Sequence, residues 1–466
     1  MTPSRSIPSP TPQAPQAPQA PPIPLASADE VDAWLASRGF FHMELTLDRI
    51  RHCLQALALD SPRIPTVQVV GTNGKGSTAC FLAHIAAAQG LQVGLFTSPH
   101  LLHPRERMVL VDDFGLEPIP AEFWVAAANA VLHTPTGPSL TYFELTLAMA
   151  LWWFQEEDVD LIILEAGLGG GGDATTAAPR EMLLVSSIGM DHADVIGPSL
   201  SAIAADKARA VPEQGIVLAV PQDPRAMFRL ERVAAARQAQ LFEIRLPRGF
   251  DPDFGFYPLP DPLAGEGPAP LALGLPGPHQ AMNARLAMAA WLVLAGRHGW
   301  PRDVANSREG LARTWLPGRL QRVPAVAGVH PAMLLDAAHN APALAILERA
   351  LAGLPRPERR PRDLVFTCLK DKDLAAITPG LARLVPGQCV VPELPESSRS
   401  MPAAEVVARL RPAFGDRVRA GGVLPEVLAA LDPAAEAPVL CCGSLYLLAE
   451  FFKLAPHLLG PWQAAP

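Results

Sequence analysis

A glycine-rich segment between an apolar run and a helix of small residues constrains this chain of 466 residues more than any other feature. The β-branched run Thr66–Val70 leads into Gly71-Thr72-Asn73-Gly74-Lys75-Gly76-Ser77, and a helix is expected over Thr78–Gln89. Three glycines let successive N–H groups converge at a helix start, where they bind anions. Lys75 adds a positive charge and Ser77 a hydroxyl that suits Mg²⁺. We therefore expect a phosphate loop for ATP or GTP; a glycine-rich turn with a solvated lysine is the alternative.

The rest of the chain alternates short apolar runs with helical stretches. Further strands are expected at Leu91–Phe96, Val159–Leu164 and Met182–Ser187, and a second series begins near Met333. Such alternation predicts parallel sheets covered on both faces, with ligands at the carboxyl ends of the strands. We expect an α/β protein in which a large P-loop-type parallel-sheet ATPase domain precedes a smaller Rossmann-like domain. The expected boundaries are 1–24 for a disordered proline-rich tail, 25–318 for the first domain and 319–466 for the second, with a linker over 317–328.

Composition narrows the class of protein. Hydrophobic residues make up 49% of the chain and charged residues 18%, and the formal net charge is −8. These values exclude general disorder, and the lack of a long basic block argues against nucleic acid or a membrane surface as partner. No apolar run approaches the roughly 20 residues of a membrane span, and no export signal is visible. The six cysteines lack C-x-x-C spacing, so we expect buried thiols in a reducing compartment. A monomeric cytoplasmic protein is the prediction.

Polar residues follow several of the expected strands. Ser98 follows the second strand, Glu165 the third and His192 the fourth, while Lys207 lies on a helix that begins near Ser199. Hard oxygen donors with one imidazole suit a Mg²⁺ ion that bridges triphosphate oxygens. Each residue also has an ordinary alternative: a serine before a turn, an acid that caps a helix, a loop histidine or a solvated lysine.

The second half of the chain adds further candidates. Arg319 lies near the expected domain junction, and its planar guanidinium suits phosphate oxygens, with a surface ion pair as the alternative. Asp336 ends the first strand of the second series, where a carboxylate accepts hydrogen bonds from ribose hydroxyls. Lys370-Asp371-Lys372-Asp373 ends the next strand, and a solvated charge run is its ordinary interpretation.

Together these motifs resemble the folylpolyglutamate synthase/dihydrofolate synthase family, a branch of the Mur-ligase-like amide-forming ATPases. The matches follow the family's order from about Trp34 to Glu450. The resemblance implies an ATP-dependent ligase that joins L-glutamate to dihydropteroate, or to the γ-carboxylate of tetrahydrofolate, through an acyl phosphate. It implies ATP and Mg²⁺ at two sites; a requirement for K⁺ or another monovalent cation stays open, as does the choice between one activity and both.

The resemblance also implies roles for individual residues. The implied catalytic residues are Lys75, His192, Arg319 and Lys207, the last carbamylated by CO₂. The implied metal ligands are Ser98, Glu165, His192 and Lys207. The implied ATP contacts are Thr72, Asn73, Gly74, Lys75, Gly76, Ser77, Asn283, Arg319 and Asp336. The implied pteroate or folate site is Thr141, Gly172, Asp173 and Ala174, and the implied glutamate contacts are His339 and Ser444.

The chain departs from the family's pattern beside this site. Gly171-Gly172 stands where the glycine-rich motif continues with Arg-Leu, and Arg209-Ala210 replaces Gly-Ile after Lys207-Ala208. A Mur-type cell-wall amino-acid ligase is the nearest alternative, but the stretch between residues 25 and 70 is too short for its additional N-terminal domain. A P-loop NTPase without ligase activity is the alternative from a different class.

Overall fold

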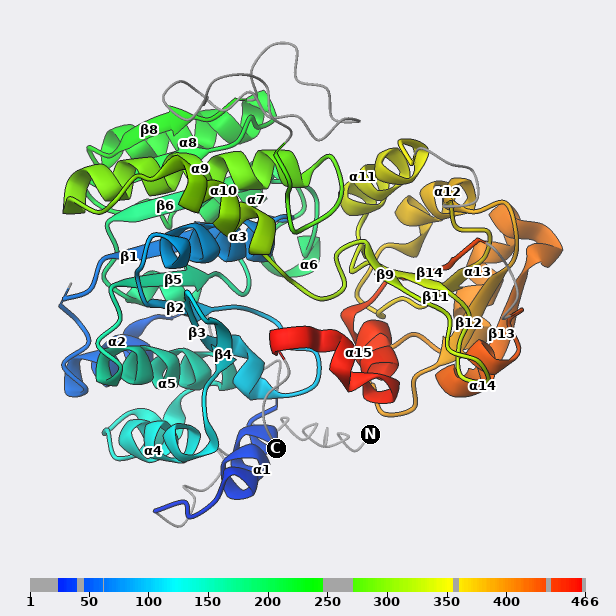
Figure 1. Ribbon diagram of the computed structural model, residues 1–466, viewed down its shortest axis with the longest axis horizontal. Coiled ribbons are helices and arrows are strands. Elements are labelled where there is room, and N and C mark those ends of the chain that lie inside the picture. Colours follow the sequence, from blue (N-terminus) through cyan, green and yellow to red (C-terminus); the bar gives the residue numbers. More distant parts are fainter. Residues whose placement is uncertain are drawn as a thin grey trace, which may run out of the picture.

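The computed structural model describes residues 24–39, 46–61, 63–245, 271–354, 360–432 and 437–462. The expected tail over 1–24 falls outside them, apart from residue 24. Two α/β lobes lie side by side, the first coloured blue to green and the second yellow to red (Figure 1). Within the described ranges, each lobe has its own sheet, one of eight strands and one of six. The expected fold class, a large parallel-dominated lobe followed by a smaller one, is confirmed.

The larger sheet has the strand order β4-β3-β2-β5-β1-β6-β7-β8. Its strands are β1 (Thr66–Val70), β2 (Val93–Phe96), β3 (Met108–Asp112), β4 (Gly115–Pro118), β5 (Leu161–Glu165), β6 (Met182–Val185), β7 (Ile216–Ala219) and β8 (Gln240–Glu243). The pairs from β2 to β8 are parallel, whereas β3 pairs antiparallel with β2 and with β4. The parallel strands β1, β2, β5 and β6 were expected from the sequence, whereas this antiparallel edge was not. Asp112 turns the hairpin, since its carboxylate accepts the N–H groups of Phe114 and Gly115.

Helices cover both faces of this sheet because its central strands are apolar on both sides. In β1, Val67 and Val69 face one hydrophobic core, and Val70 faces another. The first face is covered by α3 (Lys75–Ala88), α9 (Gln280–His298) and α10 (Val304–Arg313). The opposite face is covered by α1 (Ala28–Ser37), α2 (Asp48–Ala56), α4 (Ala121–Leu132), α5 (Tyr142–Glu156), α7 (Leu200–Ala208) and α8 (Pro224–Ala236), and α6 (Ala193–Ile196) precedes α7.

The smaller sheet has the order β13-β12-β11-β14-β10-β9. Its strands are β9 (Gln321–Val323), β10 (Met333–Leu335), β11 (Leu364–Phe366), β12 (Cys389–Glu393), β13 (Val418–Val423) and β14 (Val439–Cys442). Its helices are α11 (Ala341–Ala352), α12 (Leu374–Leu384), α13 (Ala403–Phe414), α14 (Leu424–Ala429) and α15 (Leu445–Leu454). Strand β9, antiparallel to β10, lies inside the stretch 317–328 that we expected to be a linker, so that expectation was wrong.

The C-terminal segment η6 (Pro456–Trp462) returns to the junction between the lobes, where it packs beside β4. The indole N–H of Trp462 donates to the carbonyl of Trp315 over 3.0 Å, and the side-chain amide of Gln321 donates to the carbonyl of Leu458 over 2.9 Å. These bonds tie the end of the described chain to the segment that connects the lobes. The red segment beside α15 in Figure 1 shows this return.

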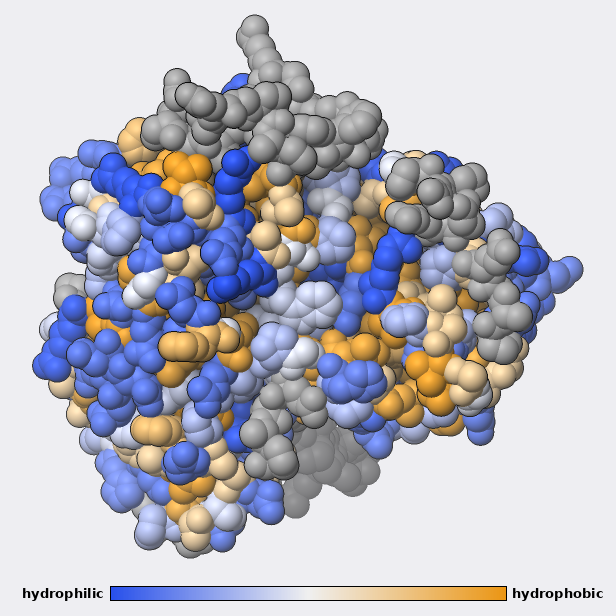
Figure 2. Space-filling model, viewed as in Figure 1, coloured by the Kyte–Doolittle hydropathy of each residue, from blue (hydrophilic) through white to orange (hydrophobic). Residues whose placement is uncertain are grey.

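The mixed polar surface and the buried cysteines match what the composition predicted. On the visible face in Figure 2, hydrophilic residues are interspersed with scattered hydrophobic ones. All six cysteines are buried and free, as expected. Among the helices of the described ranges, none has the length and apolar character that spanning a membrane requires.

Candidate functional site

The phosphate loop connects β1 to α3. The helix begins at Lys75, earlier than the sequence indicated, so the lysine lies in its first turn. Gly74 caps it with φ of 87°, and a Cβ there would approach Asn283 Oδ1 to 2.6 Å. Glycine is therefore required at this position both for its backbone conformation and for the close side chain.

The loop after β6 braces the first residues of the phosphate loop. The amides of Thr72 and Asn73 donate to the carbonyl of Ser187 over 2.7 Å and 3.2 Å. The hydroxyl of Thr72 donates to the carbonyl of Gly189 and accepts its N–H, both over 3.0 Å. These amides are engaged within the protein, whereas the first N–H groups of α3 lack partners within the helix. The start of α3 is therefore the part of the loop suited to an anion.

Glu165 lies at the carboxyl end of β5, next to β1 in the sheet. Its Oε2 accepts the N–H of Ser98 over 3.0 Å, and a Cβ on Gly76 would lie 3.2 Å from the same oxygen. Burial raises the pKa of Glu165, and the nearby charge of Lys75 limits that rise. A buried carboxylate thus lies against the first turn of α3.

Lys207 lies in the last turn of α7 and is 3% exposed. Its Nζ donates to the carbonyl of Gly71 over 2.8 Å and to that of Gly169 over 3.5 Å. Burial, followed by repulsion from Lys75, lowers the pKa of Lys207 to about 7. The amine is therefore neutral in a large fraction of molecules near neutral pH.

His192 has a different set of contacts. It adopts φ of 50°, and its Nε2 lies 3.7 Å from Asp191 Oδ2. Burial lowers the pKa of His192 to about 4. Within the described ranges, no three side chains of His, Cys, Asp or Glu gather as a metal cluster. Of the four expected metal ligands, the structure therefore brings Ser98 and Glu165 into direct contact and joins Lys207 to the phosphate loop.

The other expected nucleotide contacts lie around these groups. Asn283 is held beside Gly74 by a hydrogen bond from its Nδ2 to Gln280 Oε1 of 2.8 Å. Asp336 accepts the N–H groups of Leu320 and Ala338 over 3.0 Å and 2.9 Å. Burial raises the pKa of Asp336, as of Glu165, and Arg319 is among the cations that limit both increases. The positive charge of Arg319 thus lowers the pKa of one carboxylate in each lobe, Glu165 and Asp336.

Three of the remaining expected residues serve as helix caps. Thr141 Oγ1 accepts the N–H of Glu144 at the start of α5, and Ser444 Oγ accepts that of Tyr446 at the start of α15. Asp173 is buried, caps the short helix η3 (Ala174–Ala177) and also accepts the N–H of Leu168. Gly172 and Ala174 flank Asp173 in the chain. These contacts explain how the loops are built; the ligand roles of these residues stay predictions.

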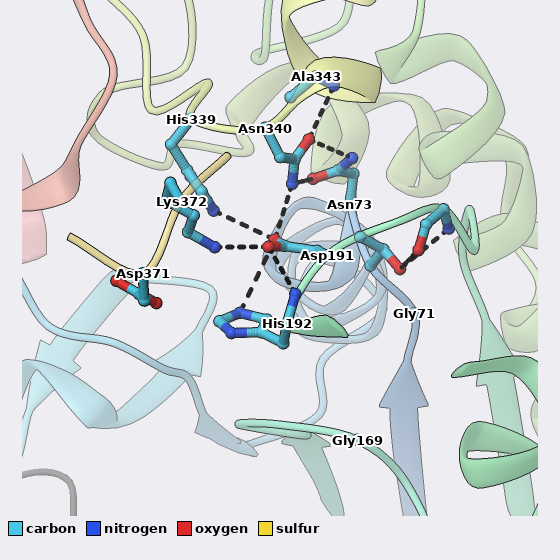
Figure 3. A network of polar contacts seen from close by, with 12 residues as sticks. Gly71, Asn73, Gly169, Asp191, His192, His339, Asn340, Ala343, Asp371 and Lys372 are labelled. Carbon is cyan, nitrogen blue, oxygen red and sulfur yellow. Dashed lines mark hydrogen bonds and ion pairs between the residues drawn. The ribbon is translucent and has the colours of Figure 1, made fainter. Parts of the chain in front are cut away.

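The structure adds residues that we did not select from the sequence. Asp191 accepts hydrogen bonds from Lys372 over 2.5 Å and from Asn340 over 2.9 Å, and His339 Nε2 lies 3.5 Å away (Figure 3). Lys372 belongs to the run for which a solvated charge run was the ordinary alternative, and that alternative does not hold for this residue because its side chain is only 8% exposed. Asp191 follows β6, Asn340 follows β10 and Lys372 follows β11. A position after a parallel strand is the sequence signal that could have identified these residues.

Comparison with known proteins places this geometry in a family. No family model matches the chain. The dihydrofolate synthase/folylpolyglutamate synthase of Escherichia coli (strain K12) is 30% identical over 438 residues, which cover 92% of this chain and 96% of that enzyme. The chain belongs to the folylpolyglutamate synthase/dihydrofolate synthase family.

Solved structures of this family agree with the observed fold. The folylpolyglutamate synthase of Mycobacterium tuberculosis, complexed with ADP and AMPPCP, matches with a TM-score of 0.77 at 26% identity, covering 93% of this chain and 98% of that chain. The bifunctional folylpolyglutamate synthase/dihydrofolate synthase of Yersinia pestis, complexed with AMPPNP and Mn ion, matches with a TM-score of 0.75 at 26% identity, covering 95% of this chain and 100% of that chain. Both lobes of this family member therefore have counterparts in nucleotide-bound relatives.

Proposed function

We propose that this protein is an ATP-dependent ligase that forms an amide bond between L-glutamate and dihydropteroate, the γ-carboxylate of a folate, or both. The observation that carries the proposal is the match over 96% of the E. coli enzyme, because it includes both lobes. The braced phosphate loop supports the ATP-dependent step. A phosphate loop alone would equally suit an NTPase without ligase activity.

Activation of the acid is the first step. A carboxylate is a poor electrophile, so the substrate carboxylate attacks the γ-phosphorus of ATP, and the products are an acyl phosphate and ADP. Lys75 and the N–H groups at the start of α3 bind the phosphates, with Thr72, Asn73, Gly76 and Ser77 forming the loop. Arg319 approaches from the junction and spreads the charge of the transferring group. Asn283 and Asp336 are the proposed contacts of the nucleoside.

The residues around Glu165 fit a divalent cation. Mg²⁺ commonly takes one or two protein carboxylates, and phosphate oxygens with water supply its other ligands. Glu165 offers one buried carboxylate beside the first turn of α3, with Ser98 next to it. We assign Mg²⁺ to these two residues; when bound, it withdraws charge from the γ-phosphate oxygens.

Lys207 is the proposed ligand of a second divalent cation, and His192 is a further proposed ligand of the first. A neutral lysine amine adds CO₂ and loses a proton to give a carbamate, which supplies the oxygen that an ammonium lacks. The pKa of about 7 at Lys207, caused mainly by burial, favours this reaction at physiological pH. A monovalent cation is a further candidate, but none of the described residues indicates a site for it.

The amide bond forms in the second step. The amine of glutamate attacks the carbonyl carbon of the acyl phosphate and loses a proton, and inorganic phosphate leaves. His339 and Ser444 are the proposed glutamate contacts, and Thr141 with residues 172–174 the proposed pteroate contacts. Contact between the lobes excludes water, which would otherwise hydrolyse the acyl phosphate.

Three further properties belong to the same proposal. We assign 25–318 to the ATP and pteroate domain and 319–466 to the glutamate domain. The protein acts on small molecules as a cytoplasmic monomer. The buried free thiols support a reducing compartment.

The direct test supplies ATP, Mg²⁺ and radiolabelled glutamate with dihydropteroate, or separately with tetrahydrofolate. Product masses increased by one glutamate residue identify which acid is used. Phosphate release without an amide product under all conditions would favour an NTPase instead, and ligation only to a cell-wall precursor would favour a Mur-type enzyme.

A further inference from the structure

A single buried carboxylate of the larger lobe receives several contacts from the smaller lobe. Asp191, in the loop after β6, is 8% exposed at its side chain, and so is Lys372. Lys372 Nζ donates to Asp191 Oδ1 over 2.5 Å, although the two residues are 181 positions apart in the sequence. Figure 3 shows the ammonium pointing at this carboxylate from the opposite lobe.

The second oxygen of the same carboxylate faces two more groups of the smaller lobe. Asp191 Oδ2 accepts the side-chain N–H of Asn340 over 2.9 Å and lies 3.5 Å from His339 Nε2. The ammonium of Lys372 supplies the positive charge that a carboxylate at this depth requires. Each oxygen of the carboxylate is therefore engaged from across the junction, Oδ1 by Lys372 and Oδ2 by Asn340.

Asn340 extends this contact to the phosphate loop. Its side-chain amide exchanges two hydrogen bonds of 3.1 Å with that of Asn73, and its Oδ1 also caps α11 by accepting the N–H of Ala343. The chain of contacts from Lys372 through Asp191 and Asn340 therefore ends at Asn73, two residues before Lys75 (Figure 3). A displacement of the smaller lobe would move the partner of a phosphate-loop side chain.

We infer that Lys372 is a positioning residue for ligation: by holding Asp191 and, through it, Asn340, it keeps the glutamate lobe in register with the phosphate loop. This role rests on the ligase function proposed above. It predicts that Lys372 matters for the capture of the acyl phosphate by the amine more than for the binding of nucleotide.

The test compares Lys372→Met with Lys370→Met in the full chain. Lys370 lies two positions earlier, is exposed and donates only within its own lobe, to the carbonyl of Ser398 over 2.7 Å. We measure the dissociation constant of AMPPNP, the KM for glutamate and the ratio of amide formed to phosphate released. A misplaced lobe raises the KM for glutamate about 10-fold or more and lowers the ratio below one, while AMPPNP affinity changes less than about threefold. Lys370→Met keeps all three values within about twofold.

Two further variants separate positioning from folding. Removal of one partner strands a buried charge, so Lys372→Met is compared with Asp191→Asn/Lys372→Met, in which neither charge is left. The double variant recovers thermal stability but not the ratio of amide to phosphate, and Lys372→Arg restores part of that ratio. A folded variant without Lys372 that keeps the wild-type KM for glutamate and a ratio of one overturns the inference.

Different results would refute the ligase function and the positioning role of Lys372. A wild-type protein that makes no amide refutes the ligase function. The arrangement of the lobes is then measured independently of activity, by X-ray scattering in the presence of AMPPNP. We expect Lys372→Met to increase the radius of gyration and Lys370→Met to leave it unchanged. Equal radii for the two variants and the wild type overturn the role of Lys372.

Discussion

Lys207 Nζ donates a hydrogen bond of 2.8 Å to the carbonyl of Gly71, the first residue of the phosphate loop, across 136 positions of sequence. The bond is possible because the backbone after β5 lies directly on the end of α7. A Cβ at Gly170 would lie 2.5 Å from Lys207 Cα, and one at Gly169 would lie 2.5 Å from Asp206 Oδ2. Glycines in this loop therefore bring a buried amine to the phosphate loop.

Replacing Lys207 with alanine should lower ligation at least about 100-fold, because it removes the proposed metal-binding carbamate. Acetate or formate should restore part of the activity by supplying a carboxylate in the vacated space. The carbamate itself is detected by carbon-13 NMR after equilibration with labelled CO₂. Full activity with an unmodified lysine in the presence of both metal ions would contradict the assignment.

The loop at Gly171 is shaped by Arg209. A Cβ on Gly171 would lie 2.3 Å from Arg209 Cβ and 2.6 Å from its Nε. We expect Gly171→Ala to destabilise the protein by about 1–3 kcal/mol through overpacking, and Arg209→Gly in the same chain to recover most of that loss. Gly380→Ala is the control for an added methyl group without a clash, since its nearest neighbours lie at 4.0 Å; because Gly380 lies inside α12, this variant should gain up to about 1 kcal/mol. A denaturant midpoint of Gly171→Ala equal to that of the wild type would show that Arg209 moves aside without a cost in stability.

Acidification should destabilise the protein partly through His279. Burial lowers the pKa of His279 from 6.5 to about 4. The unfolded chain takes up this proton as the pH falls through about 6.5, but the folded chain does so only near pH 4, so the unfolded state binds more protons in between. Stability is therefore lost as the pH falls across that window, by at most about 2 kcal/mol for this partly exposed side chain.

Denaturant unfolding from pH 7 to pH 4 measures this contribution. His279→Gln should flatten the dependence on pH, whereas His457→Gln, at an exposed position, should leave it as in the wild type. Identical pH profiles for all three proteins would refute the contribution of His279.

Thr141 offers a test that separates a structural from a ligand role. Its hydroxyl accepts the N–H of Glu144 over 3.3 Å, and the Glu144 carboxylate accepts the N–H of Thr141 over 2.8 Å. Thr141→Ala should cost about 1 kcal/mol of folding free energy, and Thr141→Ser should cost little. A higher KM for dihydropteroate in the alanine variant, beyond this loss, would support the predicted substrate contact. Equal stability of the two variants would contradict the cap.

Local patterns were sufficient where a residue's neighbours in the chain determine its structure. The expected bounds of β1 match the observed strand, and Ser199 caps α7 as expected near that position. The sequence also predicted that Glu165 and the phosphate loop lie at the same edge of the sheet, because both follow expected parallel strands. That β5 and β1 are adjacent came from the structure.

Contacts that depend on how the lobes meet could not be predicted in this way. Lys370 and Lys372 look alike in the sequence, yet Lys370 is exposed and Lys372 is buried against Asp191 of the other lobe. The contact of Gly171 with Arg209 likewise joins two loops that no local pattern relates. Strand β9 escaped notice because its three residues carry no apolar run of strand length.

The central claim is that ATP activates the substrate by phosphorylating its carboxylate. Dihydropteroate labelled with ¹⁸O in the carboxylate, incubated with the protein, ATP, Mg²⁺ and L-glutamate, tests it directly. One ¹⁸O atom is expected in each phosphate released from fully labelled substrate, because the leaving phosphate keeps an oxygen of the original acid. Amide formation accompanied by unlabelled phosphate would contradict it.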